Sequence, residues 1–162
     1  MQETLKHRKS AGGALCFGEV RSVSGSPRGA QRILAVDPGR DKCGVAVVER
    51  DGQVVYHSVV ATSQVAQEVQ QLVAEHDVGS VLLGDRTAAK TVAQLLRSLG
   101  VQPVIVDEHR SSEEGRRRYF QDNPPRGWRR LLPVSLQTPP RAYDDYVAVV
   151  LAERYLKLAR AR

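Results

Sequence analysis

The stretch Ile33-Leu-Ala-Val-Asp-Pro-Gly-Arg-Asp-Lys-Cys-Gly-Val-Ala-Val47 decides the fold of this chain. Its first four residues form an apolar run that stops at Asp37-Pro38-Gly39, the pattern of a buried strand entering a turn. Two further strands are predicted at 43–48 and 54–60, and Asp51-Gly52 between them supplies the positive backbone angles of a tight hairpin. The chain is therefore expected to open with three antiparallel strands.

Beyond these strands the hydrophobic period changes to that of a helix. Apolar residues at helical spacing predict helices at 65–73 and 92–99, and each is followed by a short apolar run, at 81–83 and 104–106, that is typical of a buried strand. Right-handed helical crossovers lay such strands parallel to the first strand and beside it. The predicted fold class is α/β, a mixed five-stranded sheet with three antiparallel strands, then two parallel strands, and helices on both faces.

The remaining sequence predicts two more helices separated by a long loop. Ser111 and Glu114 have the spacing of a capping box and open a short helix. Five prolines between 124 and 140 then interrupt regular structure. An amphipathic helix begins near Asp144-Asp145 and continues to about residue 158.

Acidic residues follow three strands of the predicted sheet. The first, fourth and fifth strands run the same way, so their carboxyl ends share one edge, and Asp37, Asp85 and Glu108 follow them within one or two residues. Neighbouring strands lie only about 4.8 Å apart, so the carboxylates raise one another's pKa and favour a bound cation. Oxygen ligands favour Mg²⁺ or Mn²⁺, and two such ions can activate water to hydrolyse a phosphodiester.

Each acid also has a purely structural interpretation. Asp37 in Asp-Pro-Gly could belong to an ordinary turn, and Asp144 and Asp145 could cap the last helix at the positive end of its dipole. Glu108 could be a surface acid at a strand end. Asp85 could be a loop residue, and it is the weakest of the candidates.

Three blocks of the sequence resemble YqgF-type nucleases, which are relatives of RuvC resolvases. The stretch quoted above resembles the family's opening strand with its Asp-x-Gly. Val106-Asp-Glu-His-Arg-Ser-Ser-Glu-Glu114 resembles an Asp-Glu-Arg strand end followed by a Ser/Thr-rich helix start, with His109 in place of the arginine. Tyr143-Asp-Asp-Tyr-Val-Ala-Val-Val-Leu-Ala-Glu-Arg-Tyr-Leu156 is similar to the final helix, and Asp144 matches the aspartate at its start.

The resemblance implies an RNase H-like fold over roughly residues 32–158. It also implies that Asp37, Glu108 and Asp144 are the catalytic and metal-binding acids of a nuclease that uses one or two Mg²⁺ or Mn²⁺ ions. Asp85 and Asp145 remain additional candidates for the same site. Because His109 replaces the family arginine, the neighbouring Arg110 is the expected substitute.

The proline-rich loop places Trp128, the only tryptophan, among Arg126, Arg129 and Arg130. Base stacking on an aromatic ring beside phosphate contacts suits single-stranded nucleic acid, so this loop is a candidate substrate clamp. In the alternative interpretation Trp128 packs inward and the arginines are merely solvated.

The composition favours a polyanionic partner and a cytoplasmic protein. The net charge is +6, and the two cysteines, Cys16 and Cys43, form no CxxC pair or disulfide framework. Residues 1–30 mix Gly, Ser and basic residues, which predicts a flexible basic tail before a nuclease domain at 31–162. No apolar stretch approaches the roughly 18 residues of a membrane span.

The sequence therefore predicts a metal-dependent nuclease, and the resemblance to YqgF-type nucleases implies RNA processing of the pre-16S ribosomal RNA type as its role. One alternative keeps the chemistry and changes the substrate to branched DNA: a Holliday junction resolvase, which would be a homodimer. A second alternative is a nucleic-acid-binding module that has lost hydrolysis, whose binding would survive metal chelation.

Overall fold

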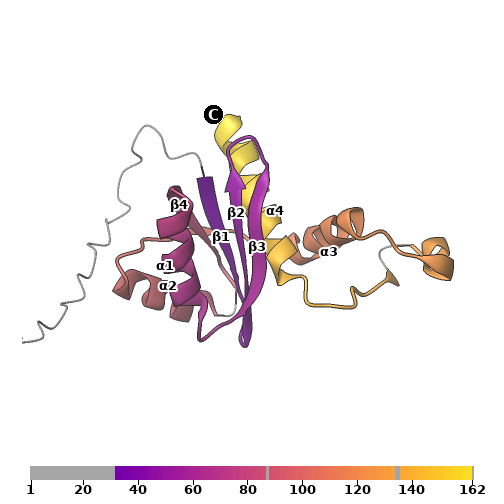
Figure 1. Cartoon of the computed structure of the whole chain (residues 1–162), viewed down its shortest axis with the longest axis horizontal. Helices are drawn as coiled ribbons and strands as arrows, with labels where there is room; N and C mark the ends of the chain where they lie inside the picture. The colour runs from indigo at the N-terminus through magenta and orange to yellow at the C-terminus, as the bar shows by residue number, and fades with distance from the viewer. Residues whose placement is uncertain (1–31, 87, 134–135, 162) are drawn as a thin grey trace, which may run out of the picture.

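The computed structural model describes residues 32–86, 88–133 and 136–161 (Figure 1). The basic tail predicted at residues 1–30 lies outside this range. The elements are β1 (Arg32–Pro38), β2 (Lys42–Glu49), β3 (Val54–Ala61), α1 (Val65–Glu75), β4 (Val78–Gly84), α2 (Ala89–Ser98), β5 (Val104–Val106), α3 (Ser111–Asp122), the 3-10 helix η1 (Gly127–Leu131) and α4 (Asp144–Arg160).

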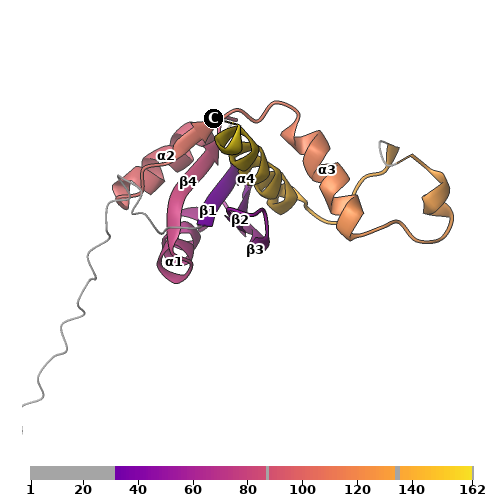
Figure 2. The ribbon, with the colours of Figure 1, turned by 90° about the horizontal axis from the view of Figure 1, so that it is seen from above.

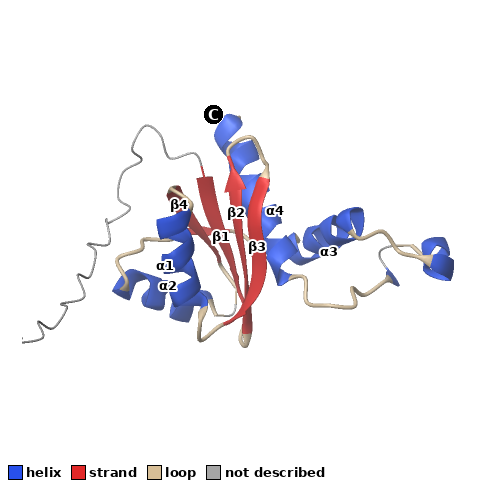
Figure 3. Cartoon of the chain, in the orientation of Figure 1, coloured by secondary structure: helices blue, strands red, loops and turns tan. Residues whose placement is uncertain are grey.

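The five strands form one sheet in the order β3-β2-β1-β4-β5 (Figure 3). β1 pairs antiparallel with β2 and parallel with β4, β2 pairs antiparallel with β3, and β4 pairs parallel with β5. The hairpin between β2 and β3 turns at Gly52, which has φ 101°, and the Gln53 amide donates to Asp51 Oδ1 at 2.9 Å. The predicted mixed sheet is confirmed, with β1 at its centre.

Helices cover both faces of the sheet, as the sequence predicts. Figure 2 shows α1 and α2 on one face and α4 on the other. Side chains alternate along β1, so Leu34 and Val36 pack with α1 and α2 while Ile33 and Ala35 pack with α4. Asp37 is the next residue on the same side of the strand as Ile33 and Ala35. The alternation therefore directs its carboxylate toward the face that α4 covers.

α3 packs on the outer side of α4, where Gly115 leaves room for Val147. The predicted capping box at its start is wrong. The residue before the helix is Arg110, with φ 62°, and no side chain caps the helix. The Ser111 hydroxyl donates to the Glu108 carbonyl at 2.8 Å, and Glu114 pairs with Arg154 at 2.7 Å. Both side chains of the expected box are thus engaged in contacts outside it.

The loop after α3 projects away from the sheet and carries η1 (Figure 1). Gln137 gives the loop internal order, since its Nε2 donates to the carbonyls of Arg129 and Leu132 at 2.9 and 2.8 Å. Trp128 is 72% exposed, so the inward-packing interpretation of this residue is wrong. Within the described chain, no helix is long and apolar enough to cross a membrane.

Gly44 sets how closely α4 approaches the sheet. A Cβ at this position would lie 1.9 Å from the backbone oxygen of Asp144, the first residue of α4. Gly44→Ala is therefore expected to lower the free energy of unfolding by about 1–3 kcal/mol or more, because the helix start must move. A thermal or urea melt measures this loss. An unchanged melt would show that α4 does not rest on β2 at this point.

Candidate active site

Asp37 lies inside β1, opposite Gly44 of β2, and not in the turn that follows. The turn interpretation of Asp-Pro-Gly is therefore corrected, because strand pairing continues through Pro38. Asp37 is half-buried. Gly44, its partner across the strands, is also the residue on which the Asp144 backbone rests. One strand pair thus brings the end of β1 and the start of α4 together.

Glu108 is 1% exposed and lies two residues beyond β5. Its main chain is held on both sides: the amide donates to Asp85 Oδ1 at 3.2 Å, and the carbonyl accepts from the amide and hydroxyl of Ser111. Its side chain passes over Gly84 at the end of β4, where a Cβ would lie 1.3 Å from Glu108 Oε1. Only glycine at this position leaves space for the carboxylate.

Asp144 and Asp145 are the first two residues of α4. The residue before the helix is Tyr143, and no side chain caps it, so the capping interpretation of the two aspartates is wrong. Asp144 is half-buried and close enough to raise the pKa of Asp37. Asp145 is buried and contacts His57 of β3 instead. The two neighbouring aspartates therefore lie in different environments: Asp144 lies near Asp37, and Asp145 contacts β3.

Burial and mutual repulsion raise the pKa values of the three acids. Burial, together with the charge of Asp144, raises the pKa of Asp37 to about 6. Burial, together with the charge of Asp37, raises the pKa of Glu108 to about 8. Burial also raises the pKa of Asp144, with repulsion from Asp145 adding to it. A group of acids that resists ionisation in this way is suited to binding a cation.

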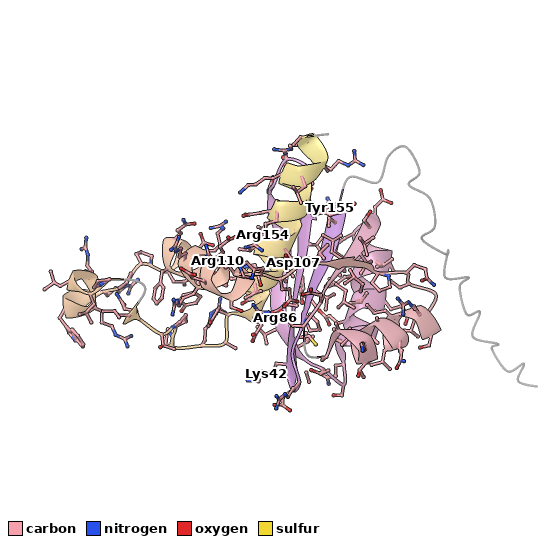
Figure 4. All side chains as sticks on the ribbon, turned by 180° about the vertical axis from the view of Figure 1, so that it is seen from behind. Lys42, Arg86, Asp107, Arg110, Arg154 and Tyr155 are labelled. Carbon is pink, nitrogen blue, oxygen red and sulfur yellow. The ribbon has the colours of Figure 1, made fainter. Side chains whose placement is uncertain are left out.

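Arg86, which is labelled in Figure 4, is a cation that lies beside Glu108 and is not among the site residues that the sequence predicts. Its Nε lies 3.3 Å from Glu108 Oε2, its Nη2 donates to the Glu108 carbonyl at 3.2 Å, and its Nη1 donates to Ser112 Oγ at 2.9 Å. Arg86 lowers the pKa of both Asp37 and Glu108 against the larger effect of burial. Its place in the sequence, two residues after β4 at the same edge as the acids, is the signal that could have identified it.

Arg110 does not take the place expected for it. Its side chain is exposed at the start of α3 and forms no hydrogen bond or ion pair with the described residues. His109 contributes its carbonyl, which accepts from Arg154 Nη1 at 2.7 Å. The guanidinium next to Glu108 therefore comes from the segment after β4 and not from the segment after β5. Asp85 is exposed and holds the Glu108 amide, as described above.

The chemistry of the three acids fits a divalent ion, although their present arrangement is not a ready-made site. In the part of the chain that the structure describes, no three His, Cys, Asp or Glu side chains are grouped so as to hold a metal. Both oxygens of the buried Glu108 carboxylate nevertheless lack a hydrogen-bond partner among the described residues. A buried carboxylate that accepts no hydrogen bond is costly even with Arg86 beside it, and a hard cation would satisfy it.

A mixed five-stranded sheet of this order, with helices on both faces, is an RNase H-like fold. The sequence matches the family model described as the Tex protein YqgF-like domain over residues 31–117, which is more than half of the chain, and the protein belongs to that family.

Solved structures of RuvC have the same fold. RuvC of Thermus thermophilus in complex with a Holliday junction substrate aligns with a TM-score of 0.53 and 14% identity, over 80% of this chain and 96% of that one. A second Thermus thermophilus RuvC structure aligns with a TM-score of 0.52 at the same identity and coverage. No curated protein matches the sequence. The expected family and fold class are thus confirmed.

Proposed function

We propose that this protein is a metal-dependent nuclease that hydrolyses phosphodiester bonds, with Asp37, Glu108 and Asp144 as its catalytic acids. The observation that carries the proposal is Glu108, a buried carboxylate whose two oxygens have no hydrogen-bond partner among the described residues and whose pKa is raised to about 8. The YqgF-like family and the RuvC-like fold support a function of the nuclease or resolvase type.

The acids would hold one or two Mg²⁺ or Mn²⁺ ions. Such an ion supplies neutralisation of the phosphate charge and a lowered pKa of bound water when it is present. Glu108 is fixed by its main-chain contacts on both sides, Asp37 by strand pairing, and Asp144 by the helix start on Gly44. Arg86 is only partly covered, so its guanidinium can contact a phosphate that lies over the acids.

Nucleic acid is the proposed substrate, and we favour RNA of the pre-16S ribosomal type. The test is to incubate the full chain with labelled RNA, single-stranded DNA and a four-way DNA junction, each with Mn²⁺, Mg²⁺ or EDTA. Metal-dependent cutting of RNA supports the proposal. Preferential cutting of the junction by a homodimer would replace it with the resolvase alternative, and binding without cutting under any condition would leave only the binding module.

The loop around η1 is proposed as a clamp for single-stranded nucleic acid. Trp128→Ala is expected to weaken binding of a single-stranded oligonucleotide by roughly 5- to 150-fold, since stacking contributes about 1–3 kcal/mol per base. Stability should not change, because the ring is largely exposed. Fluorescence anisotropy in EDTA measures the binding.

The matched control for this prediction is Leu136→Ala. Leu136 is an exposed apolar residue of the same loop, but it has no aromatic ring on which a base can stack. The Leu136 variant should bind as the wild type does. An equal loss in both variants would indicate a general hydrophobic contact, and no loss in either would remove the loop from the substrate path.

A further inference from the structure

A second group of polar and aromatic side chains lies on the other side of the α4 N-terminus from Arg86. We call it the Asp145 cluster, and it consists of His57 of β3, Arg141 from the segment before α4, Asp145 and Tyr146 of α4, and Tyr119 of α3. His57 and Arg141 contact the Asp145 carboxylate directly, and the two tyrosine rings contact Arg141. None of these contacts involves the three proposed catalytic acids.

Asp145 is the centre of the cluster and is only 2% exposed. Its Oδ2 lies 2.8 Å from His57 Nδ1 and 3.8 Å from an Arg141 nitrogen, whereas its Oδ1 has no hydrogen-bond partner among the described residues. A buried carboxylate that is only partly satisfied contributes little to stability, and a well-packed apolar group would often be as stable. The fold alone thus gives no reason for an aspartate at this position.

Arg141 is the residue that this carboxylate holds. Its guanidinium lies 5.6 Å from the ring centre of Tyr119 and 5.8 Å from that of Tyr146, so two aromatic rings and one carboxylate define its position. Its side chain is nevertheless 55% exposed, and the groups that face its guanidinium are Asp145 and the side chains of Tyr119 and Tyr146. A guanidinium that is held in place and is still more than half exposed is preorganised to bind a phosphate.

The position of Arg141 relates it to the proposed active site. It precedes Asp144 by three residues, which can span at most about 11 Å. In the sheet order β3-β2-β1-β4-β5, Asp37 lies on the central strand, Arg86 follows β4, and the Asp145 cluster lies toward β3. The two arginines therefore flank the acids on opposite sides. A strand whose scissile phosphate lay over the acids would place a neighbouring phosphate near Arg141.

We propose that Arg141 binds a backbone phosphate of the nucleic acid next to the scissile one, and that Asp145 is the positioning residue that holds its guanidinium between the two tyrosine rings. His57 orients Asp145 from the other side. The inference rests on the proposed function, because it takes the substrate to be a nucleic-acid strand across the acids. It adds a substrate contact outside the catalytic acids and the loop around η1.

The test measures binding of a fluorescent single-stranded RNA by the full chain in EDTA, at several salt concentrations. Arg141→Gln is expected to weaken binding roughly tenfold at low salt, and to reduce the slope of log Kd against log salt by about 0.7, the value for one phosphate contact on a single strand. Arg141→Lys should restore the slope and only part of the affinity. Arg97→Gln is the matched control, since Arg97 is exposed on α2, which covers the other face of the sheet.

Asp145→Asn separates positioning from simple charge. Removing a negative charge near the substrate should tighten binding if only long-range electrostatics matter, whereas loss of positioning should weaken binding several-fold and leave the salt slope nearly unchanged. Tighter binding by Asp145→Asn would thus overturn the positioning role. Wild-type affinity and slope in Arg141→Gln would overturn the phosphate contact while the nuclease proposal stands. Failure of the wild type to bind any nucleic acid would overturn both.

Discussion

Asp37→Asn is expected to reduce metal-dependent cleavage by a factor on the order of 10³ or more, since the metal ion contributes several kcal/mol to the transition state. The substitution keeps the size of the side chain and its place in β1, so the fold should remain intact. It removes one of the negative charges that repel each other at this edge, and the apo protein should be at least as stable as the wild type. Single-turnover cleavage with saturating Mn²⁺ and a thermal melt measure the two effects.

The control for this experiment is Asp85→Asn. Asp85 also lies near Glu108, but its Oδ1 accepts a hydrogen bond from the Glu108 amide, and an asparagine oxygen can accept the same bond. The Asp85 variant should therefore keep most of the cleavage activity. A loss equal to that of Asp37→Asn would make Asp85 a fourth catalytic acid. Full activity of Asp37→Asn would remove Asp37 from the mechanism.

Hydrophobic patterning in the sequence was sufficient to predict the sheet and the acids at its edge. The strands of this sheet are short apolar runs with turn signals between them, and the rules for parallel crossovers leave few ways to assemble them. Asp37 and Glu108 could be located because they follow such runs within one and two residues. Their positions depend on the backbone, and the pattern of the sequence determines the backbone.

The partners of these acids could not be predicted in the same way. His57 and Asp145 are 88 residues apart, and their contact depends on how α4 crosses β3. Arg86 reaches Glu108 because Gly84 lets the carboxylate pass over β4, a packing detail that no periodicity reports. The capping box failed for a related reason: its serine and glutamate found partners in Glu108 and Arg154, which only the tertiary fold brings near. Side-chain contacts between distant segments are the part that required the structure.

The stability of the metal-free protein is expected to fall as the pH rises from about 5 to 8. The pKa of Glu108 is raised from 4.5 to about 8 and that of Asp37 from 3.8 to about 6, so the folded chain retains protons that the unfolded chain has already lost. Stability is therefore greatest below the unfolded pKa values and declines until the pH passes the folded ones. The decline should amount to no more than a few kcal/mol.

Glu108→Gln tests whether the fall in stability between pH 5 and 8 arises from the buried acid of the proposed metal site. The variant removes the buried charge, so in EDTA at pH 8 it should melt at a higher temperature than the wild type and show a smaller fall between pH 5 and 8. Mn²⁺ should raise the melting temperature of the wild type more at pH 8 than at pH 5, because the ion binds the deprotonated acids, and it should not raise that of the variant. Glu113→Gln, at an exposed glutamate on α3, should follow the wild type throughout. If Glu108→Gln were no more stable than the wild type in EDTA but no longer responded to Mn²⁺, Glu108 would bind the ion, and its buried charge would not destabilise the metal-free fold. If the variant still responded to Mn²⁺, the ion would bind elsewhere.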